Sequence, residues 1–336
     1  MDEFIQKFLA DDFNINPSII STSKNILTKI KPQLDEIQLT TEYNNLKVIA
    51  AMRGAYLSDF HLNDSTGYGY NDMGRETIED IFKAVFKTED ALVKPQIISG
   101  THALALCLLG VLRPGDELLS VTGTPYDTLL DVINGENCGS LKDYNISYQE
   151  TKLIDGKPDF KTIASKINKN TRMILIQRSR GYSLRPALTI HEIEELIKYI
   201  KGIKNDIICM VDNCYGEFVE TKEPTEVGAD LCAGSLIKNL GGGIAPTGGY
   251  VVGRKDLIKQ CMSRLTAPGL DKEFGPSLLT NRLTLQGLFF APKVVGEALK
   301  GAIFGSAMLE HYGFDVYPKY NEARGDIVTA AVLKDK

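Results

Sequence analysis

Apolar residues recur at helical spacing through the first part of the chain. The stretches FIQKFL (4–9) and LTKIKPQLDEIQLTTEYNNLKVIAAM (27–52) place them three or four positions apart, which is typical of amphipathic helices. A loop rich in Gly, Asn and Asp follows at 64–76, and the helical pattern resumes at 77–85. We therefore expect residues 1–75 to form an N-terminal helical segment that ends in an arm.

Beyond the arm, apolar strands alternate with helices. The runs RMILIQRS (172–179) and DIICMVD (206–212) are largely apolar, as in strands that are buried on both faces. Between them, TIHEIEELIKYIKGI predicts an amphipathic helix, with Thr189 as its N-cap and Glu192 three residues later. This alternation predicts an α/β fold in which helices flank a mostly parallel sheet.

The pattern changes near residue 283, where a long helical run begins. It is followed by DVYPKYNEARGDIVTAAVLKDK (315–336), which is strand-like. We therefore expect three parts in the chain. They are the helical segment and arm (1–75), a large domain (76–282), and an interdomain helix with the start of a truncated, incomplete C-terminal α+β domain (283–336).

Composition argues against a nucleic-acid-binding protein, a membrane protein and a metalloprotein. The net charge is −5, and no basic stripe interleaved with aromatic residues indicates a nucleic-acid partner. The apolar runs are too short to span a membrane, and the acidic N-terminus has no signal segment, so we expect a cytoplasmic protein with no membrane partner. The six cysteines form no CxxC pair and the four histidines are scattered, which predicts free thiols and no metal site.

One lysine stands directly before a cluster of glycines in GSLIKNLGGGIAPTGGY (234–250). A P-loop has its lysine after the glycines, followed by Ser or Thr, but here Lys238 precedes them and is followed by Asn239. The dinucleotide fingerprint fails because Pro246 takes the last glycine position counted from Gly241. Apolar residues throughout the segment argue against a flexible linker. The third interpretation is a lysine that forms a Schiff base with pyridoxal phosphate.

Other residues suit that cofactor. Asp212 ends an apolar strand, where α/β sheets build ligand sites, and a carboxylate there would keep the pyridine nitrogen protonated. Ser99, Gly100 and Thr101 open a helix directly after a strand, so their amides could hold the phosphate. Tyr126 follows the next strand and would stack on the ring, although an ordinary core tyrosine is a serious competing interpretation.

Together these segments resemble the fold-type I pyridoxal-phosphate enzymes of the cysteine and methionine metabolism group. Within that group they most resemble the methionine gamma-lyase-like family, also called aluminium resistance proteins. The similar segments are TGYGYNDMGRETIE, SGTHAL, GTPYDTL, QRSRGYSLRP, VDNCYGEF and GSLIKNLGGGIAPTGGY, spread over roughly residues 60–325. The resemblance implies the PLP-dependent transferase-like fold, pyridoxal 5'-phosphate as cofactor, and a homodimer or homotetramer with active sites at subunit boundaries.

The resemblance also implies roles for single residues. Lys238 would carry the cofactor, Asp212 would pair with the ring nitrogen, and Tyr126 would stack on the ring. Gly100 and Thr101 would give their amides to the phosphate. Ser235 matches the family's phosphate-binding serine, and a turn hydroxyl explains it equally well.

Two segments depart from the family pattern. Tyr70 takes the position from which related enzymes reach a neighbouring subunit's phosphate, but Asp72 stands where they have arginine, and a carboxylate cannot clamp phosphate. Arg75 is a candidate to compensate. QRSRGYS has no asparagine to touch the cofactor's ring oxygen. Arg178 and Arg180 would suit that oxygen or a substrate carboxylate, and we favour Arg180.

The expected function is a pyridoxal-phosphate-dependent carbon–sulfur lyase. Its substrate would be a sulfur-containing amino acid, cleaved by β- or γ-elimination, with Lys238, Asp212 and Tyr126 as catalytic residues. In related enzymes the arginine that binds the substrate carboxylate usually comes from the C-terminal domain, where this chain offers Arg324. The alternative is a truncated, catalytically weak cofactor-binding relative with a structural or regulatory role. A second rival is a nucleotide-binding α/β protein that uses the run 241–249.

Overall fold

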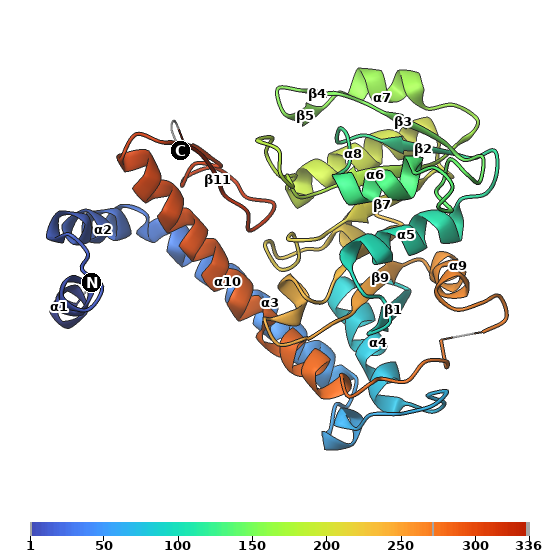
Figure 1. Ribbon diagram of the computed structural model, residues 1–336, viewed down its shortest axis with the longest axis horizontal. Coiled ribbons are helices and arrows are strands. Elements are labelled where there is room, and N and C mark those ends of the chain that lie inside the picture. The colour runs from blue at the N-terminus through green and yellow to red at the C-terminus, as the bar shows by residue number, and fades with distance from the viewer. Residues whose placement is uncertain (1, 271, 334–336) are drawn as a thin grey trace.

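A mixed seven-stranded sheet forms the centre of the molecule (Figure 1). The computed structural model describes residues 2–270 and 272–333. In spatial order the strands are β1 (Asp90–Lys94), β9 (Gly249–Gly253), β8 (Leu231–Ser235), β7 (Ile208–Asp212), β6 (Thr171–Gln177), β2 (Glu117–Ser120) and β3 (Ser147–Glu150). Five of them, β8 to β3, run parallel, whereas β9 is antiparallel to both of its neighbours. The predicted mostly parallel sheet is confirmed.

Helices cover both faces of this sheet, as the apolar strands predict. Because successive strand residues point to opposite faces, Ile208 and Met210 of β7 pack into one hydrophobic cluster and Cys209 and Val211 into another. The first cluster includes residues of α5 (Gly100–Val111), α6 (Asp127–Asn134) and α9 (Lys255–Leu265). The second includes α8 (Ile190–Ile203) and α7 (Phe160–Lys166).

The start of α8 confirms a detailed prediction. The Glu192 N–H donates to Thr189 Oγ1, and Glu192 Oε2 accepts from the Thr189 N–H at 2.9 Å. This reciprocal pair is a capping box, which satisfies two of the backbone donors that a helix start leaves free. The remaining short elements are β4 (Leu153–Ile154), β5 (Lys157–Pro158) and three 3-10 turns, η1 (Asp59–Leu62), η2 (Pro224–Val227) and η3 (Asn239–Gly241).

The N-terminal segment is helical, as predicted, and extends away from the sheet (Figure 1). It consists of α1 (Glu3–Asp11), α2 (Pro17–Lys29) and α3 (Lys31–Gly54), and α3 packs lengthwise on α10 (Asn281–His311). After the arm, α4 (Met73–Phe86) begins four residues earlier than the predicted helix. The cause is Asp72, whose Oδ1 accepts from the Arg75 N–H at 2.9 Å and so caps the helix.

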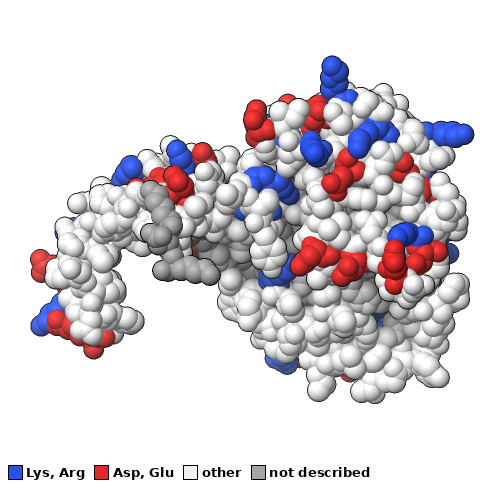
Figure 2. Space-filling view, turned by 45° about the horizontal axis from the view of Figure 1, so that its top comes forward, with Lys and Arg blue, Asp and Glu red and all other residues white. Residues whose placement is uncertain are grey.

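After α10, the strand-like segment forms a small antiparallel pair, β10 (Asp315–Tyr317) and β11 (Ala330–Val332). None of the helices in the described ranges has the length and apolar character needed to cross a membrane. On the face shown in Figure 2, lysine and arginine residues are interspersed with acidic ones rather than drawn into a basic stripe.

Candidate functional site

The lysine predicted as the cofactor anchor lies where β8, the start of α5 and the loop after β7 converge. A Cβ atom built on Gly100 would lie 2.9 Å from Cys214 Sγ, 3.6 Å from Ser235 Cβ and 3.8 Å from Lys238 Nζ. Gly100 is the first residue of α5, Ser235 the last of β8, and Cys214 follows β7 by two positions. Three segments that are far apart in sequence therefore meet around one amine, and glycine at position 100 allows this close approach because a side chain there would crowd Cys214 Sγ.

The Lys238 amine is surrounded by acidic groups. Its Nζ lies 4.1 Å from the centroid of the Tyr215 ring, within the range of a cation–π contact. Burial lowers the pKa of Lys238, but the nearby Cys214, Tyr215 and Asp212 outweigh it, so the pKa lies above its ordinary value. Tyr215 adopts φ = 71°, a left-handed conformation that is uncommon for an aromatic residue. The amine is thus held protonated, and a reaction that needs its lone pair must first remove that proton.

Asp212 lies beside this lysine as a buried carboxyl. It is 4% exposed, and its Oδ1 accepts from the Cys214 N–H at 3.1 Å. Burial raises the pKa of Asp212, while the Cys214 N–H, Lys238 and Arg185 oppose that rise. A carboxyl group in such a setting suits a partner that carries a proton on nitrogen, because pairing with it would compensate the buried charge.

The start of α5 supplies hydrogen-bond donors. Ser99 caps the helix, since its Oγ accepts from the His102 N–H at 3.0 Å, and the first N–H groups of any helix have no partner within it. Thr101 Oγ1 lies 3.1 Å from the Tyr126 hydroxyl, so the predicted stacking tyrosine borders the helix start. Burial, followed by the charge of Asp212, raises the pKa of Tyr126, which keeps its phenol protonated.

Ser235 has a local partner of its own. Its side chain is fully buried, and its Oγ accepts from the Ile237 N–H at 3.3 Å. This is the bond of a turn hydroxyl. Its Cβ nevertheless borders the space in front of Gly100, so the structure keeps both interpretations of this serine.

The two arginines at the end of β6 point in different directions. Arg178 is fully buried, with Nη1 donating to Asn213 Oδ1 and Nη2 to Glu220 Oε2, both at 2.8 Å. It braces the loop that follows Asp212. The Nη1 of Arg180 donates to the Tyr317 carbonyl oxygen at 2.6 Å. The structure therefore directs Arg180 at the C-terminal segment.

In the arm, the side chains of Asp72 and Arg75 bond to the backbone of this chain and do not form a phosphate-binding site. Tyr70 is 52% exposed, and its ring lies 4.9 Å from that of Phe274. Asp72, which stands at the departure from the family pattern, caps α4. Arg75 is buried, and its Nη1 donates to the carbonyl oxygens of Gly69 and Gly275. Arg75 therefore ties two loops together and is not presented to a ligand outside this chain.

Sequence reasoning missed residues of the loop after β7. It treated Cys214 as one of six free thiols, whereas the structure brings its Sγ close to Gly100 and Lys238. It gave no role to Tyr215, whose ring lies against the same amine. Glu217 was also missed: it is fully buried and accepts from the Tyr250 hydroxyl at 2.8 Å, and burial raises its pKa to about 8. Their position in the sequence could have indicated a role, because Cys214, Tyr215 and Glu217 directly follow a strand that ends in Asp212.

The glycine cluster after Lys238 serves packing. A Cβ on Gly241 would collide with the Leu236 carbonyl oxygen, and one on Gly242 with the Gly287 carbonyl oxygen of α10. The backbone therefore approaches α10 as closely as glycine allows. Packing alone accounts for glycine at these two positions, without crowding by a ligand and without a phosphate loop.

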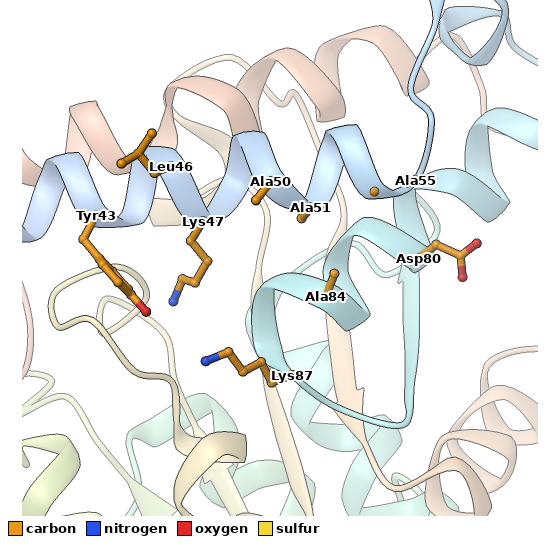
Figure 3. A pocket seen from close by; sticks show the side chains of 10 residues that line it. Tyr43, Leu46, Lys47, Ala50, Ala51, Ala55, Asp80, Ala84 and Lys87 are labelled. Atoms are coloured by element: carbon orange, nitrogen blue, oxygen red, sulfur yellow. The ribbon is translucent and has the colours of Figure 1, made fainter.

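A separate groove of 780 Å³ lies between α3 and α4 (Figure 3). Lys47 and Lys87 extend into it from the two sides, and each lies within 4 Å of a Glu226 carboxylate oxygen. None of the residues that converge on Lys238 lines this groove. Among the residues that the structure describes, no group of His, Cys, Asp and Glu side chains is arranged to hold a metal ion.

Comparison with known proteins agrees with this geometry. The family model for methionine gamma-lyase matches residues 19–336. YnbB of Bacillus subtilis, an uncharacterised protein, is 50% identical over 311 residues, which cover 91% of this chain and 73% of that protein. A crystal structure of a Clostridium novyi protein, named a carbon-sulfur lyase involved in aluminium resistance, has a TM-score of 0.96 and 46% identity and covers 100% of this chain and 81% of its own.

A more distant structure bears on the fold alone. YhfS of Escherichia coli, named a pyridoxal-5'-phosphate-dependent protein, is 17% identical with a TM-score of 0.59, over 82% of this chain and 70% of its own. The predicted fold-type I architecture is thereby confirmed. With a family match that spans most of its length, the chain belongs to the methionine gamma-lyase family.

Proposed function

We propose that this protein is a pyridoxal 5'-phosphate-dependent carbon–sulfur lyase. Its substrate is a sulfur-containing amino acid. The reaction is a β- or γ-elimination that expels the sulfur as a thiol or sulfide, after which water releases ammonia and a 2-oxo acid. The family membership supports a lyase. The observation that carries the proposal is the convergence of Gly100, Cys214 and Ser235 around the Lys238 amine, with Asp212 buried beside it.

The residues present fit the proposed cofactor. Lys238 would attach it, and glycine at position 100 keeps a side chain from crowding Cys214 and the amine. The buried Asp212 would face the ring nitrogen, and the N–H groups at the start of α5 would receive the phosphate. Tyr126, next to Thr101, is placed to cover the ring. When bound, the cofactor supplies an electron sink for carbanion chemistry.

The chain's own groups would then handle the protons. Lys238 Nζ is the base that would take the proton from the substrate α-carbon, since it is the amine at which Gly100, Cys214 and Ser235 converge. Asp212 would hold the proton on the ring nitrogen, and its burial strengthens that charge pairing. Tyr126 keeps its own proton, because burial raises its pKa.

The first test is spectroscopic. Purified protein mixed with pyridoxal phosphate should acquire a visible absorbance band that is missing in Lys238→Ala. Incubation with cysteine, cystathionine or methionine should then release a 2-oxo acid, and its identity, pyruvate or 2-oxobutyrate, would separate β- from γ-elimination. If no band forms in the wild-type protein, the proposal fails.

The alternative is a cofactor-binding relative with weak activity and a structural or regulatory role. One observation favours it: Arg324 is buried, and its Nη2 donates to Ser306 Oγ at 2.9 Å. Its guanidinium is therefore engaged within the chain rather than offered to a substrate. A protein that gains the absorbance band but releases no 2-oxo acid from any of the three amino acids would favour this alternative.

We also infer that the protein assembles as a homodimer or homotetramer in the cytoplasm. Exposed apolar side chains near the arm support the assembly, among them Tyr68, Leu278 and Leu279, which are 74%, 56% and 76% exposed. Tyr70, half-exposed in the same arm, would reach the neighbouring subunit's phosphate. Light scattering tests this directly, and a monomer at micromolar concentration would contradict it.

A further inference from the structure

The helix α1 has an apolar face that the described part of its own chain leaves uncovered. Phe4, Ile5 and Phe8 lie on one side of the helix, and their side chains are 78%, 47% and 48% exposed. None of the residues of α1 is buried. The helix contacts α2 at the end of the molecule that lies farthest from the sheet (Figure 1). An amphipathic helix of this kind is stabilised when its apolar face packs on another apolar surface.

The charges of α1 indicate what kind of surface that is. Asp2 and Glu3 lie at its start, Asp11 and Asp12 lie at its end, and Lys7 is the only basic residue among positions 2–12. Helices that lie on membrane surfaces carry Lys and Arg on their polar face, so this helix is unsuited to a lipid surface. It suits an apolar protein surface that has basic side chains at its edge.

The groove between α3 and α4 offers such an apolar surface (Figure 3). Small residues line it, among them Ala50 and Ala51 of α3 and Ala84 of α4, and Leu46 at its edge is 66% exposed. Its lining on α3 runs from residue 43 to residue 55, which is about 18 Å of helix. The nine residues of α1 are about 14 Å long, so α1 fits the groove lengthwise.

The charges at this groove are complementary to those of α1. Lys47 and Lys87 extend into it and lie beside the same carboxylate, that of Glu226. Asp80, which also lines the groove, is paired with Lys83 at 2.6 Å. These three lysines and two carboxylates leave one positive charge, whereas the four carboxylates and one lysine of positions 2–12 leave three negative charges. Such complementarity favours association of the two surfaces.

The groove of the same chain is out of reach of α1. All of α2 and residues 31–42 of α3 lie between them, about 20 Å and 18 Å of helix. Ile26 of α2 packs in one cluster with Ile303 and Ala307 of α10, which holds α2 in place. The accessible groove is therefore that of another copy.

We propose that α1 of one protomer docks in the groove between α3 and α4 of a second copy of this chain. Phe4 and Phe8 would pack on the alanines of the groove, as in other complexes in which a helix binds a groove. Each copy has one such helix and one such groove, so a twofold axis would let the two copies exchange helices. This docking extends the assembly proposed above, and it does not depend on the lyase reaction.

The experiment is zero-length cross-linking of the full chain with a carbodiimide, which joins a carboxylate to a lysine amine in contact with it. Covalent dimer is separated from monomer on a denaturing gel, and the linked peptides are mapped by mass spectrometry. We expect the dimer to contain links between Lys87, whose side chain is 58% exposed, and the acidic residues of positions 2–12.

Two variants test the contact from its two sides, both at exposed positions. Phe4→Ser combined with Phe8→Ser removes the aromatic anchors, and Ala50→Asp puts a carboxylate into the groove. Each should lower the yield of these links by at least about tenfold, because aromatic anchors carry much of the binding energy of an interface and like charges repel. The matched control is Gly301→Asp, which adds the same charge at an exposed helix position with nothing within 4 Å of its Cβ.

Three results would overturn the inference. Links to Lys87 that occur only in the monomer band would show that α1 docks within its own chain. A dimer by light scattering that lacks these links, or that keeps them in both variants, would refute the docking and leave the assembly intact. A monomer by light scattering would refute both. A protein that forms the links but releases no 2-oxo acid would contradict the lyase proposal and leave the docking supported.

Discussion

Lys94 and Lys238 are both withdrawn from water, and their surroundings differ in almost every other respect. Lys94, at the end of β1, is 1% exposed, and its Nζ donates to the carbonyl oxygens of Lys272 and Phe274. Burial lowers its pKa to about 8. Lys238 is partly exposed, lies over the Tyr215 ring, and has a raised pKa because the acidic groups around it outweigh burial.

The comparison separates two criteria for a reactive lysine. A lowered pKa favours a nucleophilic amine, so pKa alone would select Lys94. The neighbouring groups select Lys238. The cavity beside Lys94 measures 10 Å³, which is about the room of one water molecule, whereas Lys238 lies where Gly100, Cys214 and Ser235 converge. We therefore assign a structural role to Lys94 and propose that Lys238 takes part in the chemistry.

The largest expected effect separates the two lysines by activity. Lys238→Ala removes the group that we propose attaches the cofactor and takes the α-proton, so we expect 2-oxo acid release to fall by at least about 1,000-fold. Its thermal unfolding should stay close to that of the wild type, because the side chain is partly exposed. Comparable activity in the variant would remove Lys238 from the mechanism.

The pH dependence of the rate of cofactor attachment should also distinguish Lys238 from Lys94. Attachment needs the neutral amine, and the raised pKa keeps Lys238 protonated at neutral pH. The capture rate, followed by absorbance, should therefore keep rising by about tenfold per pH unit to above about pH 9. A rate that levels off near pH 8 would match the pKa of Lys94 instead.

Lys94→Met should affect stability rather than chemistry. The change leaves the carbonyl oxygens of Lys272 and Phe274 without this donor, so we expect the free energy of unfolding to fall by about 1–3 kcal/mol. Urea unfolding measures this, with the exposed Lys293→Met as control. Cofactor binding should be unchanged, and a variant that loses the cofactor but not stability would contradict the assignment.

The loss of stability in Lys94→Met should also depend on pH. The folded-state pKa of Lys94, about 8, is below the ordinary 10.5, so between these values the unfolded chain binds more protons than the folded one. Its contribution to stability therefore rises with pH from about 8 to 10.5. In Lys94→Met that contribution should be missing, and the stability gap to the wild type should widen over this range.

The smallest effect concerns the space before Lys238. Gly100→Ala would put a methyl group 2.9 Å from Cys214 Sγ and 3.8 Å from Lys238 Nζ. We expect cofactor affinity to fall by about tenfold or less, with a minor loss of stability, since Sγ can shift. Gly301→Ala is the control, because nothing lies within 4 Å of a Cβ there. Unchanged cofactor affinity in Gly100→Ala would mean that the ligand lies elsewhere.

The sequence was sufficient for the features that local pattern controls. Apolar runs that stop at Asp212, and the Thr189 to Glu192 spacing, specified β7 and the capping box. The sequence also placed Asp212 at the end of an apolar strand, where α/β sheets build ligand sites, and the start of α5 directly after another strand.

Side-chain direction at loops was beyond sequence reasoning. Arg178 and Arg180 were predicted to face a ligand, but Arg178 turns inward to Glu220 and Arg180 turns to the Tyr317 carbonyl oxygen. Asp72 departed from the family pattern because it caps α4, a role that only the helix boundary reveals.

The central claim is that Lys238, not Lys94, holds the cofactor. Protein loaded with pyridoxal phosphate can be reduced with borohydride, digested and mapped by mass spectrometry, which fixes the cofactor to the lysine that bears it. The account predicts that the added mass lies on the peptide containing Lys238. An added mass on the peptide containing Lys94, or on no peptide at all, would contradict it.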